Sequence, residues 1–213
     1  MFKNSIKLIS FDAFGTLIKA KNVGKIYGEV ASKYGVSAKE SNIQVEFENL
    51  MKAVKYKRKD LSFWKDIITT TFANIGNKLP TNTDFNKFIV AFNSPNAYYV
   101  IHDSLNVVGL SIRHYNCPIV IITDSDDRFM KILPKMGFNA DKIICTAGMN
   151  SGKSNIKSWQ QWHSEFQSLN TFNYDEWLHV GDDLIVDSRI PKSLGIVTTA
   201  MPEYTSSLKK LTS

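Results

Sequence analysis

The chain has 213 residues, of which 43% are hydrophobic and 12% aromatic, which is enough for a buried core and excludes a wholly disordered protein. No apolar run approaches the roughly 18 residues of a membrane span. Two cysteines, Cys117 and Cys145, lie too far apart for a CxxC motif and are too few for a disulfide scaffold. The residues before the first apolar run are too few for a signal peptide. We therefore expect a soluble protein of a reducing compartment, the cytoplasm or the nucleus, with no membrane partner.

The net charge of +6 is unevenly distributed along the chain. The first 100 residues carry 15 Lys and Arg against 8 Asp and Glu, whereas the rest carry 11 against 12. Part of the excess is a dense basic run. Such a run attracts a polyanion or an acidic protein partner, although a short run is more often a solvated helix end. The residues of this run are Lys52, Lys55, Lys57, Arg58 and Lys59.

The first part of the chain predicts one strand followed by a helical block. Residues 6–11 form a short apolar run that ends on Asp12, and Gly15 permits a sharp turn after it. From about residue 22 to 95 the apolar residues recur at helical spacing, with no strand signal. Ser37 and Glu40 have the spacing of a capping box and predict a helix start at Ser37.

After Pro95 the pattern alternates between strands and helices. Strands are predicted at residues 118–123, 143–144, 178–180 and 196–199, with helices around residues 105–112, 129–136, 159–169 and 185–194. Repeated βα units form a parallel sheet with helices on both faces, an α/β Rossmann-like fold. We predict a core of residues 1–18 and 96–213, interrupted by an inserted all-helical cap at residues 19–95.

Chemically active side chains follow four of the predicted strands, where open parallel sheets bind their ligands. These segments are Asp12 to Thr16, Thr123-Asp124, Gly152-Lys153-Ser154, and Gly181-Asp182-Asp183 with Asp187 four residues later. Their composition suits a carboxylate nucleophile, a hydroxyl and an ammonium that bind phosphate, and a site for a hard metal ion.

The order of these four segments resembles the haloacid-dehalogenase (HAD) superfamily, in its branch with a helical cap inserted after the first strand. The resemblance covers essentially the whole chain. Within the superfamily, the segment from Tyr27-Gly28-Glu29-Val30-Ala31 through Phe63-Trp64 resembles the group known as HAD-like hydrolase domain-containing proteins. The wording FDAFGTL also resembles bacterial 2-haloacid dehalogenases.

The resemblance implies roles for the matching residues. Asp12 is the expected nucleophile, which forms a covalent aspartyl intermediate; Thr123 is expected to hydrogen-bond the transferring group, and Lys153 to hold it by charge. Mg²⁺ is the implied cofactor, and a small phosphorylated compound is the implied substrate. The implied metal ligands are Asp12, Asp182, the backbone carbonyl of Phe14, and Asp183 or Asp187, between which the sequence does not decide.

Phe14 departs from this pattern, because the phosphatases of the superfamily carry a second Asp there as the general acid and base. A phenyl ring cannot protonate a leaving alkoxide, and loss of a general acid costs roughly 10²–10⁴-fold in rate. Asp124 adds a negative charge where the family often has Asn, and Ser154 replaces the usual Pro. The first hypothesis is therefore a Mg²⁺-dependent phosphatase-type hydrolase with weakened turnover.

Two alternatives stay open. One is a catalytically impaired relative that acts as a binding or assembly module through its basic cap, and this interpretation is favoured by Phe14 and the charge distribution. The other, less favoured, is a 2-haloacid dehalogenase, in which the halide leaves without protonation, so an aromatic residue at position 14 is tolerated. Two features argue against this alternative: the acidic Gly181-Asp182-Asp183 cluster and the absence of an Arg soon after Thr16. His163 and His179 have no partners at ligand spacing and are predicted to be packing or surface residues.

Overall fold

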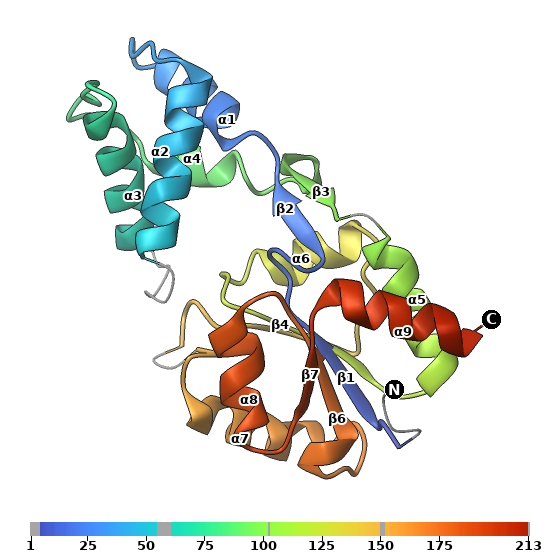
Figure 1. The fold of residues 1–213 in the computed structure, drawn as a ribbon. Helices are drawn as coiled ribbons and strands as arrows, with labels where there is room; N and C mark the ends of the chain where they lie inside the picture. Colours follow the sequence, from blue (N-terminus) through green and yellow to red (C-terminus); the bar gives the residue numbers. More distant parts are fainter. Residues whose placement is uncertain (1–4, 55–60, 102, 150–151, 213) are drawn as a thin grey trace. The chain divides into compact units, whose positions relative to one another are not determined.

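A computed structural model describes residues 5–54, 61–101, 103–149 and 152–212. The chain divides into two compact units, one formed by residues 1–19 and 100–213 and the other by residues 20–99 (Figure 1). Four residues of the basic run, Lys55, Lys57, Arg58 and Lys59, lie outside the described residues, so the polyanion or acidic-protein partner stays a prediction. Among the described helices, none has the length and apolarity that crossing a bilayer requires.

The discontinuous unit is built on a parallel five-stranded sheet in the order β5-β4-β1-β6-β7. The first strand in the sequence therefore lies at the centre, between strands contributed by later parts of the chain (Figure 1). This is the α/β Rossmann-like fold that the alternating pattern predicts. The strands are β1 (Leu8–Phe11), β4 (Ile119–Thr123), β5 (Lys142–Cys145), β6 (Trp177–Val180) and β7 (Val197–Thr199).

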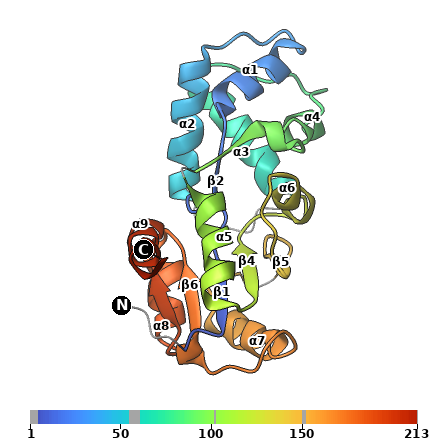
Figure 2. The ribbon, with the colours of Figure 1, turned by 90° about the vertical axis from the view of Figure 1, so that its right-hand side faces the viewer.

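Helices connect these strands. α5 lies beside the C-terminal helix α9 (Figure 2), and Tyr204 of α9 meets the ring of Phe11 on β1 at 5.9 Å between ring centroids. The sequence pattern predicts neither α9 nor the π-helical turn that occupies the first half of the helix predicted at residues 185–194. The helical elements of this unit are α5 (Ser104–Tyr115), α6 (Phe129–Lys135), α7 (Ile156–Phe166), η2 (Tyr174–Glu176), the π-helical turn η3 (Leu184–Arg189), α8 (Ile190–Lys192) and α9 (Met201–Thr212).

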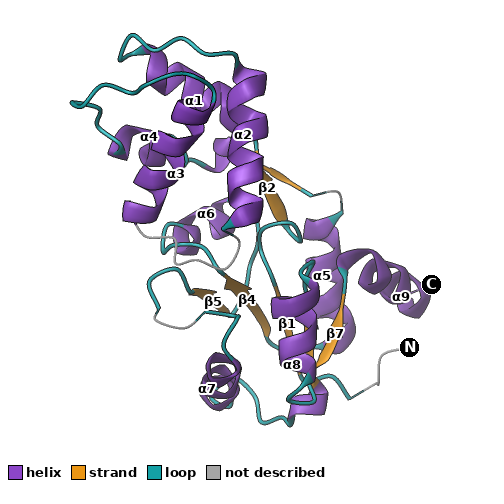
Figure 3. Ribbon diagram, turned by 60° about the vertical axis from the view of Figure 1, so that its left-hand side comes forward, coloured by secondary structure: helices purple, strands orange, loops and turns teal. Residues whose placement is uncertain are grey.

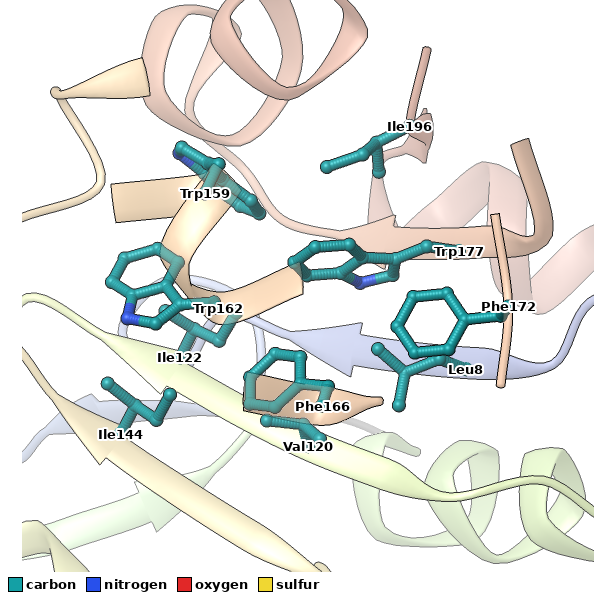
Figure 4. Close-up of a cluster of buried hydrophobic side chains, with 10 residues drawn as sticks. All are labelled: Leu8, Val120, Ile122, Ile144, Trp159, Trp162, Phe166, Phe172, Trp177 and Ile196. Carbon is teal, nitrogen blue, oxygen red and sulfur yellow. The ribbon is translucent and has the colours of Figure 1, made fainter. Parts of the chain in front are cut away.

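One face of the sheet packs against α7 through a cluster of buried aromatic and aliphatic side chains (Figure 4). Because side chains alternate along a strand, Leu8 on β1 and Trp177 on β6 share this face with Ser10 and His179 two residues further along. The two pairs are register partners, Leu8 with Trp177 and Ser10 with His179. The face thus places a serine and a histidine beside a core composed of Leu8, Val120, Ile122, Ile144, Trp159, Trp162, Phe166, Phe172, Trp177 and Ile196.

The second unit is bounded by two short strands that each straddle the division between the units, and its described residues between them are helical or in connecting loops (Figure 3). The helix predicted to begin at Ser37 begins at Glu40 instead. Lys39 occupies the N-cap position, and no side chain makes a capping hydrogen bond there, so the predicted capping box does not form. The short strands β2 (Ile18–Ala20) and β3 (Tyr98–Val100), which are not predicted from the sequence pattern, pair with each other. The helices are α1 (Val23–Ser32), α2 (Glu40–Ala53), α3 (Leu61–Asn74), α4 (Asn86–Val90) and the 3-10 turn η1 (Pro95–Ala97).

Gly24 allows α1 to approach α2 closely, and Gly24→Ala is expected to destabilise this unit by about 1–3 kcal/mol. An added Cβ would lie 2.0 Å from the backbone oxygen of Glu40, so the two helices would have to separate. Urea denaturation followed by circular dichroism measures the loss. The control is Gly28→Ala on the same helix, where the nearest atom is 3.6 Å away; it should stabilise by about 0.5–1 kcal/mol. Equal effects of the two substitutions would contradict the close approach.

Candidate active site

Asp12 follows β1 and is held at the carboxyl edge of the sheet. Its backbone N–H donates to the carbonyl oxygen of Val180 at 2.8 Å, which extends the pairing of β1 with β6 by one residue. Its side chain is buried, and its Oδ1 accepts a hydrogen bond from the ammonium of Lys153. The first and third predicted segments therefore meet, although 141 residues separate Asp12 and Lys153.

Lys153 bridges two buried carboxylates. Besides Asp12, its Nζ donates to Oδ1 of Asp187 at 2.7 Å, and both partners are almost fully removed from solvent. Burial alone would lower the pKa of Lys153, but the charges of Asp12 and Asp187 raise it above its usual value. Lys153 is therefore an ammonium at neutral pH, fixed between the candidate nucleophile and the acid that follows β6.

Three acids converge on the same point. Single carboxylate oxygens of Asp12, Asp182 and Asp187 lie within 4.8 Å of one another. Asp182 is the exposed member, and Thr16 donates to its Oδ1 at 3.4 Å. Gly15 makes room for it: its φ is +90°, and a Cβ there would lie 2.4 Å from Oδ2 of Asp182. The turn after Asp12 and the segment around Asp182 are therefore in direct contact.

The three carboxylates carry more negative charge than Lys153 can balance. Burial raises the pKa of Asp12 to about 8, although the ammonium opposes this shift. Burial also disfavours the charged form of Asp187, but Lys153 and a hydrogen bond from His179 hold its pKa below the usual range. Oxygen ligands in a group with surplus negative charge are what a hard divalent cation requires. The acidic triad therefore fits a divalent metal site.

Asp183 is placed differently from Asp182 and Asp187. Its Oδ1 accepts from the backbone N–H groups of Ile185 and Val186 and so caps the turn η3. Its own N–H donates to Oδ2 of Asp187 at 3.1 Å. In the described part of the chain, Asp187 rather than Asp183 joins the acidic group, and Asp183 orients it.

The second predicted segment supplies a hydroxyl and a carboxylate. Thr123 ends β4, is buried, and donates to the hydroxyl oxygen of Ser125 at 3.1 Å. Asp124 accepts from the Thr146 hydroxyl and, at 3.2 Å, from the backbone N–H of Lys153. Asp124 therefore ties the loop that carries Lys153 to the end of β4.

Phe14 is half-buried and packs edge-to-face against Phe129 of α6, with 4.9 Å between ring centroids. An apolar ring contact thus occupies the position where the phosphatases implied by the resemblance carry an acid. Its backbone carbonyl, the atom expected to bind a metal, belongs to the same turn as Gly15.

His179 is predicted from the sequence to be a packing or surface residue, but it contacts the candidate site. The side chain is fully buried, but its Nε2 lies 3.2 Å from Oδ1 of Asp187. A polar residue within an apolar strand that leads to the acidic motif is the signal that could have indicated this contact. His163 fits its assignment, because its ring stacks on Tyr174 at 4.0 Å between centroids.

Comparison with known proteins identifies the fold. No protein-family model matches the chain. An uncharacterized hydrolase of Schizosaccharomyces pombe is 26% identical over 199 residues, which cover 85% of this chain and 84% of that protein. One similar solved structure is the L-2-haloacid dehalogenase of Xanthobacter autotrophicus, with a TM-score of 0.66 and 15% identity over 91% of this chain and 76% of that one. Another is the HAD phosphatase of Thermococcus onnurineus, with a TM-score of 0.59 and 18% identity over 91% of this chain and 85% of that one.

A third similar structure is the HAD hydrolase YfnB of Bacillus subtilis, described as bound to magnesium (TM-score 0.71, 12% identity, 91% of this chain and 87% of that one). These likenesses show that the chain has the fold of the HAD-superfamily hydrolases. The similar proteins include both phosphatases and 2-haloacid dehalogenases, so the fold alone does not select one activity.

Proposed function

We propose that this protein is a Mg²⁺-dependent hydrolase of small phosphorylated compounds, with Asp12 as its nucleophile and with slow turnover of alkyl esters. The observation that carries the proposal is the contact of Lys153 with Asp12 and Asp187 beside the exposed carboxylate of Asp182. A carboxylate nucleophile, a buried ammonium and an acidic metal site suit attack on an anionic phosphorus centre better than attack on an uncharged carbon.

The residues present divide the reaction into two steps. Because Oδ1 of Asp12 accepts the hydrogen bond from Lys153, we assign Oδ2 as the attacking atom. The Oδ2–P bond forms as the P–O bond to the leaving group breaks, which yields an aspartyl phosphate and an alkoxide or phenolate. Water then attacks phosphorus and the Oδ2–P bond breaks; both protons of the water leave with inorganic phosphate, and the Asp12 carboxylate is regenerated.

The ammonium of Lys153 is placed beside Asp12 to stabilise the charge that develops on the phosphoryl oxygens. The Thr123 hydroxyl, which donates to Ser125 in this structure, would donate to the phosphoryl group after it turns from Ser125. Mg²⁺ held by Asp12, Asp182 and Asp187 would supply positive charge that shields the nucleophile from the anionic substrate. In the first step a proton must reach the leaving oxygen, and Phe14 cannot supply it. Esters with acidic leaving groups should therefore be the better substrates.

Asp182→Asn is expected to lower Mg²⁺ affinity by about 10-fold or more, because it removes the exposed carboxylate of the triad while keeping its shape. Isothermal titration calorimetry of Mg²⁺ into the metal-free protein measures the change. Asp66→Asn, an exposed acid on α3, is the control for loss of one negative charge and should leave the affinity unchanged. Equal Mg²⁺ affinity in the native and Asp182→Asn proteins would refute the metal site.

The proposed activity is tested with acyl, aryl and alkyl phosphates in Mg²⁺ and in EDTA, with 2-chloropropionate in parallel. We expect Mg²⁺-dependent release of phosphate from the acyl and aryl compounds and no release of chloride. Chloride release without metal would instead support the dehalogenase alternative, which the aromatic Phe14 favours. If no compound is turned over, the hydrolase proposal fails and a binding module of this fold is the better interpretation.

A further inference from the structure

A chain of buried hydrogen bonds runs beneath the acidic triad, on the sheet face that packs against α7. It begins at Trp177, whose indole Nε1–H donates to Oγ of Ser10 at 2.8 Å. Oγ of Ser10 lies 2.7 Å from Nδ1 of His179, and Nε2 of His179 lies 3.2 Å from Oδ1 of Asp187. Trp177, Ser10 and His179 are each fully removed from solvent. Water therefore cannot replace a lost partner at small cost.

The donors and acceptors assign one tautomer to His179. An indole N–H can only donate, so Ser10 accepts from Trp177 and has its own hydroxyl proton to give. The Asp187 carboxylate accepts only, so Nε2 of His179 carries the proton that points at it. Because Ser10 has its hydroxyl proton to give and lies 2.7 Å from Nδ1 of His179, Nδ1 is the acceptor and the ring carries its single proton on Nε2. Each donor in the chain then has an acceptor.

Trp159 ties this chain to the backbone of the active-site lysine. Its ring meets the imidazole of His179 edge-on at 4.9 Å between centroids. Its indole Nε1–H donates to the backbone carbonyl of Lys153 at 2.9 Å. The same indole therefore fixes the ring of His179 and the residue whose ammonium Asp187 binds.

We propose that His179 is a positioning residue, which holds Asp187 through Nε2–H so that Asp187 in turn holds the ammonium of Lys153 against Asp12. The effect of this arrangement on catalysis rests on the proposed hydrolase function, whereas the tautomer of His179 and its hydrogen bonds are independent of that function. Asp187 Oδ1 accepts from both His179 and Lys153, while Oδ2 accepts from the Asp183 N–H, so the carboxylate is fixed by donors on both oxygens. Loss of the His179 donor would allow it to rotate away from Lys153.

Two substitutions separate the hydrogen bond from the packing. His179→Gln keeps an N–H donor near the position of Nε2, whereas His179→Leu keeps an apolar side chain and removes the donor. His163→Gln and His163→Leu are the matched packing controls, because His163 lies on α7 with its ring against Tyr174 and, at 6.5 Å between centroids, against Trp177. They disturb packing beside the chain without removing the donor to Asp187. Circular dichroism and thermal unfolding establish which variants are folded.

The first measurement needs no turnover. Long-range ¹⁵N–¹H correlation spectra of the metal-free protein should show His179 as the neutral tautomer protonated at Nε2. The ¹³C carboxyl resonance of Asp187 should shift in His179→Leu and return toward its native position in His179→Gln. An Nδ1-protonated ring, or an Asp187 resonance indifferent to both substitutions, overturns the proposal even if the protein hydrolyses no ester.

The second measurement uses the best phosphate substrate with Mg²⁺. His179→Leu should lower kcat by about 10- to 100-fold with little change in KM, and His179→Gln should recover most of that loss. The His163 variants should retain native kcat. Full kcat in folded His179→Leu, or no recovery in folded His179→Gln, overturns the positioning role. Absence of turnover in the native protein defeats the proposed function alone, and the spectra then decide the role of His179.

Discussion

Asp12→Asn is expected to lower turnover by at least about 10⁴-fold and, in the same protein, to raise the free energy of unfolding. The amide cannot attack phosphorus, so the aspartyl phosphate does not form. The metal-free native protein keeps two buried carboxylates, Asp12 and Asp187, on one ammonium, and burial raises the pKa of Asp12 to about 8. On folding, Asp12 must either take up a proton or bury its charge, and asparagine at nearly equal volume avoids both costs, so we expect a gain of about 0.5–2 kcal/mol in EDTA.

Asp187→Asn provides the contrast, because Asp187 accepts hydrogen bonds from Lys153, from His179 and from the backbone N–H of Asp183. In asparagine an NH₂ group replaces one of the two accepting oxygens, so at least one of these donors would meet another donor. The free energy of unfolding of this variant should therefore fall by about 1–3 kcal/mol. Urea denaturation in EDTA compares the native protein with both variants. Destabilisation of similar size in Asp12→Asn and Asp187→Asn would show that Asp12 is a structural ion-pair partner rather than a strained functional carboxylate.

The sheet was predictable because its central strands are short apolar runs bounded by turn residues. The runs that lead to Asp12, Thr123 and Gly181 correspond to β1, β4 and β6. The elements that were missed depend on tertiary context: β2 and β3 are too short to show a period and exist because they pair with each other. The start of α2 was misplaced because the Ser37 and Glu40 spacing is a local signal that the chain does not use.

The candidate site was predictable where its residues follow strands, and not where they lie within them. Order along the sequence indicates that Asp12, Lys153 and Asp182 share one edge of a parallel sheet, since such strands end on the same side. Ser10 and His179 become partners only through the register of β1 with β6. The choice between Asp183 and Asp187 likewise depended on the turn η3, which directs one carboxylate to backbone N–H groups and the other to Lys153.

Phe14→Asp is expected to raise kcat for alkyl phosphates by about 10²–10⁴-fold, because it restores a general acid where the leaving alkoxide needs a proton. The same change should affect aryl and acyl phosphates much less, since their leaving groups are stable as anions. Steady-state kinetics on matched alkyl and aryl esters in saturating Mg²⁺ measure the two effects. Phe14→Asp also breaks the ring contact with Phe129, so thermal unfolding of each variant is measured alongside.

Phe14→Asn is the matched control, because it loses the same contact with Phe129 and has nearly the shape of aspartate but cannot donate an acidic proton. It should leave both classes of ester near their native rates. A rise for both classes in Phe14→Asp would indicate an effect on a shared step, such as activation of the water that attacks the aspartyl phosphate, or better folding or metal binding, instead of protonation of the leaving group. If the native protein already turns over alkyl esters at ordinary enzyme rates, about 1–10³ s⁻¹, another group supplies the proton, and Asp124 is the next residue to replace. The ratio of alkyl to aryl turnover is therefore the decisive quantity, because only an acid at position 14 changes it.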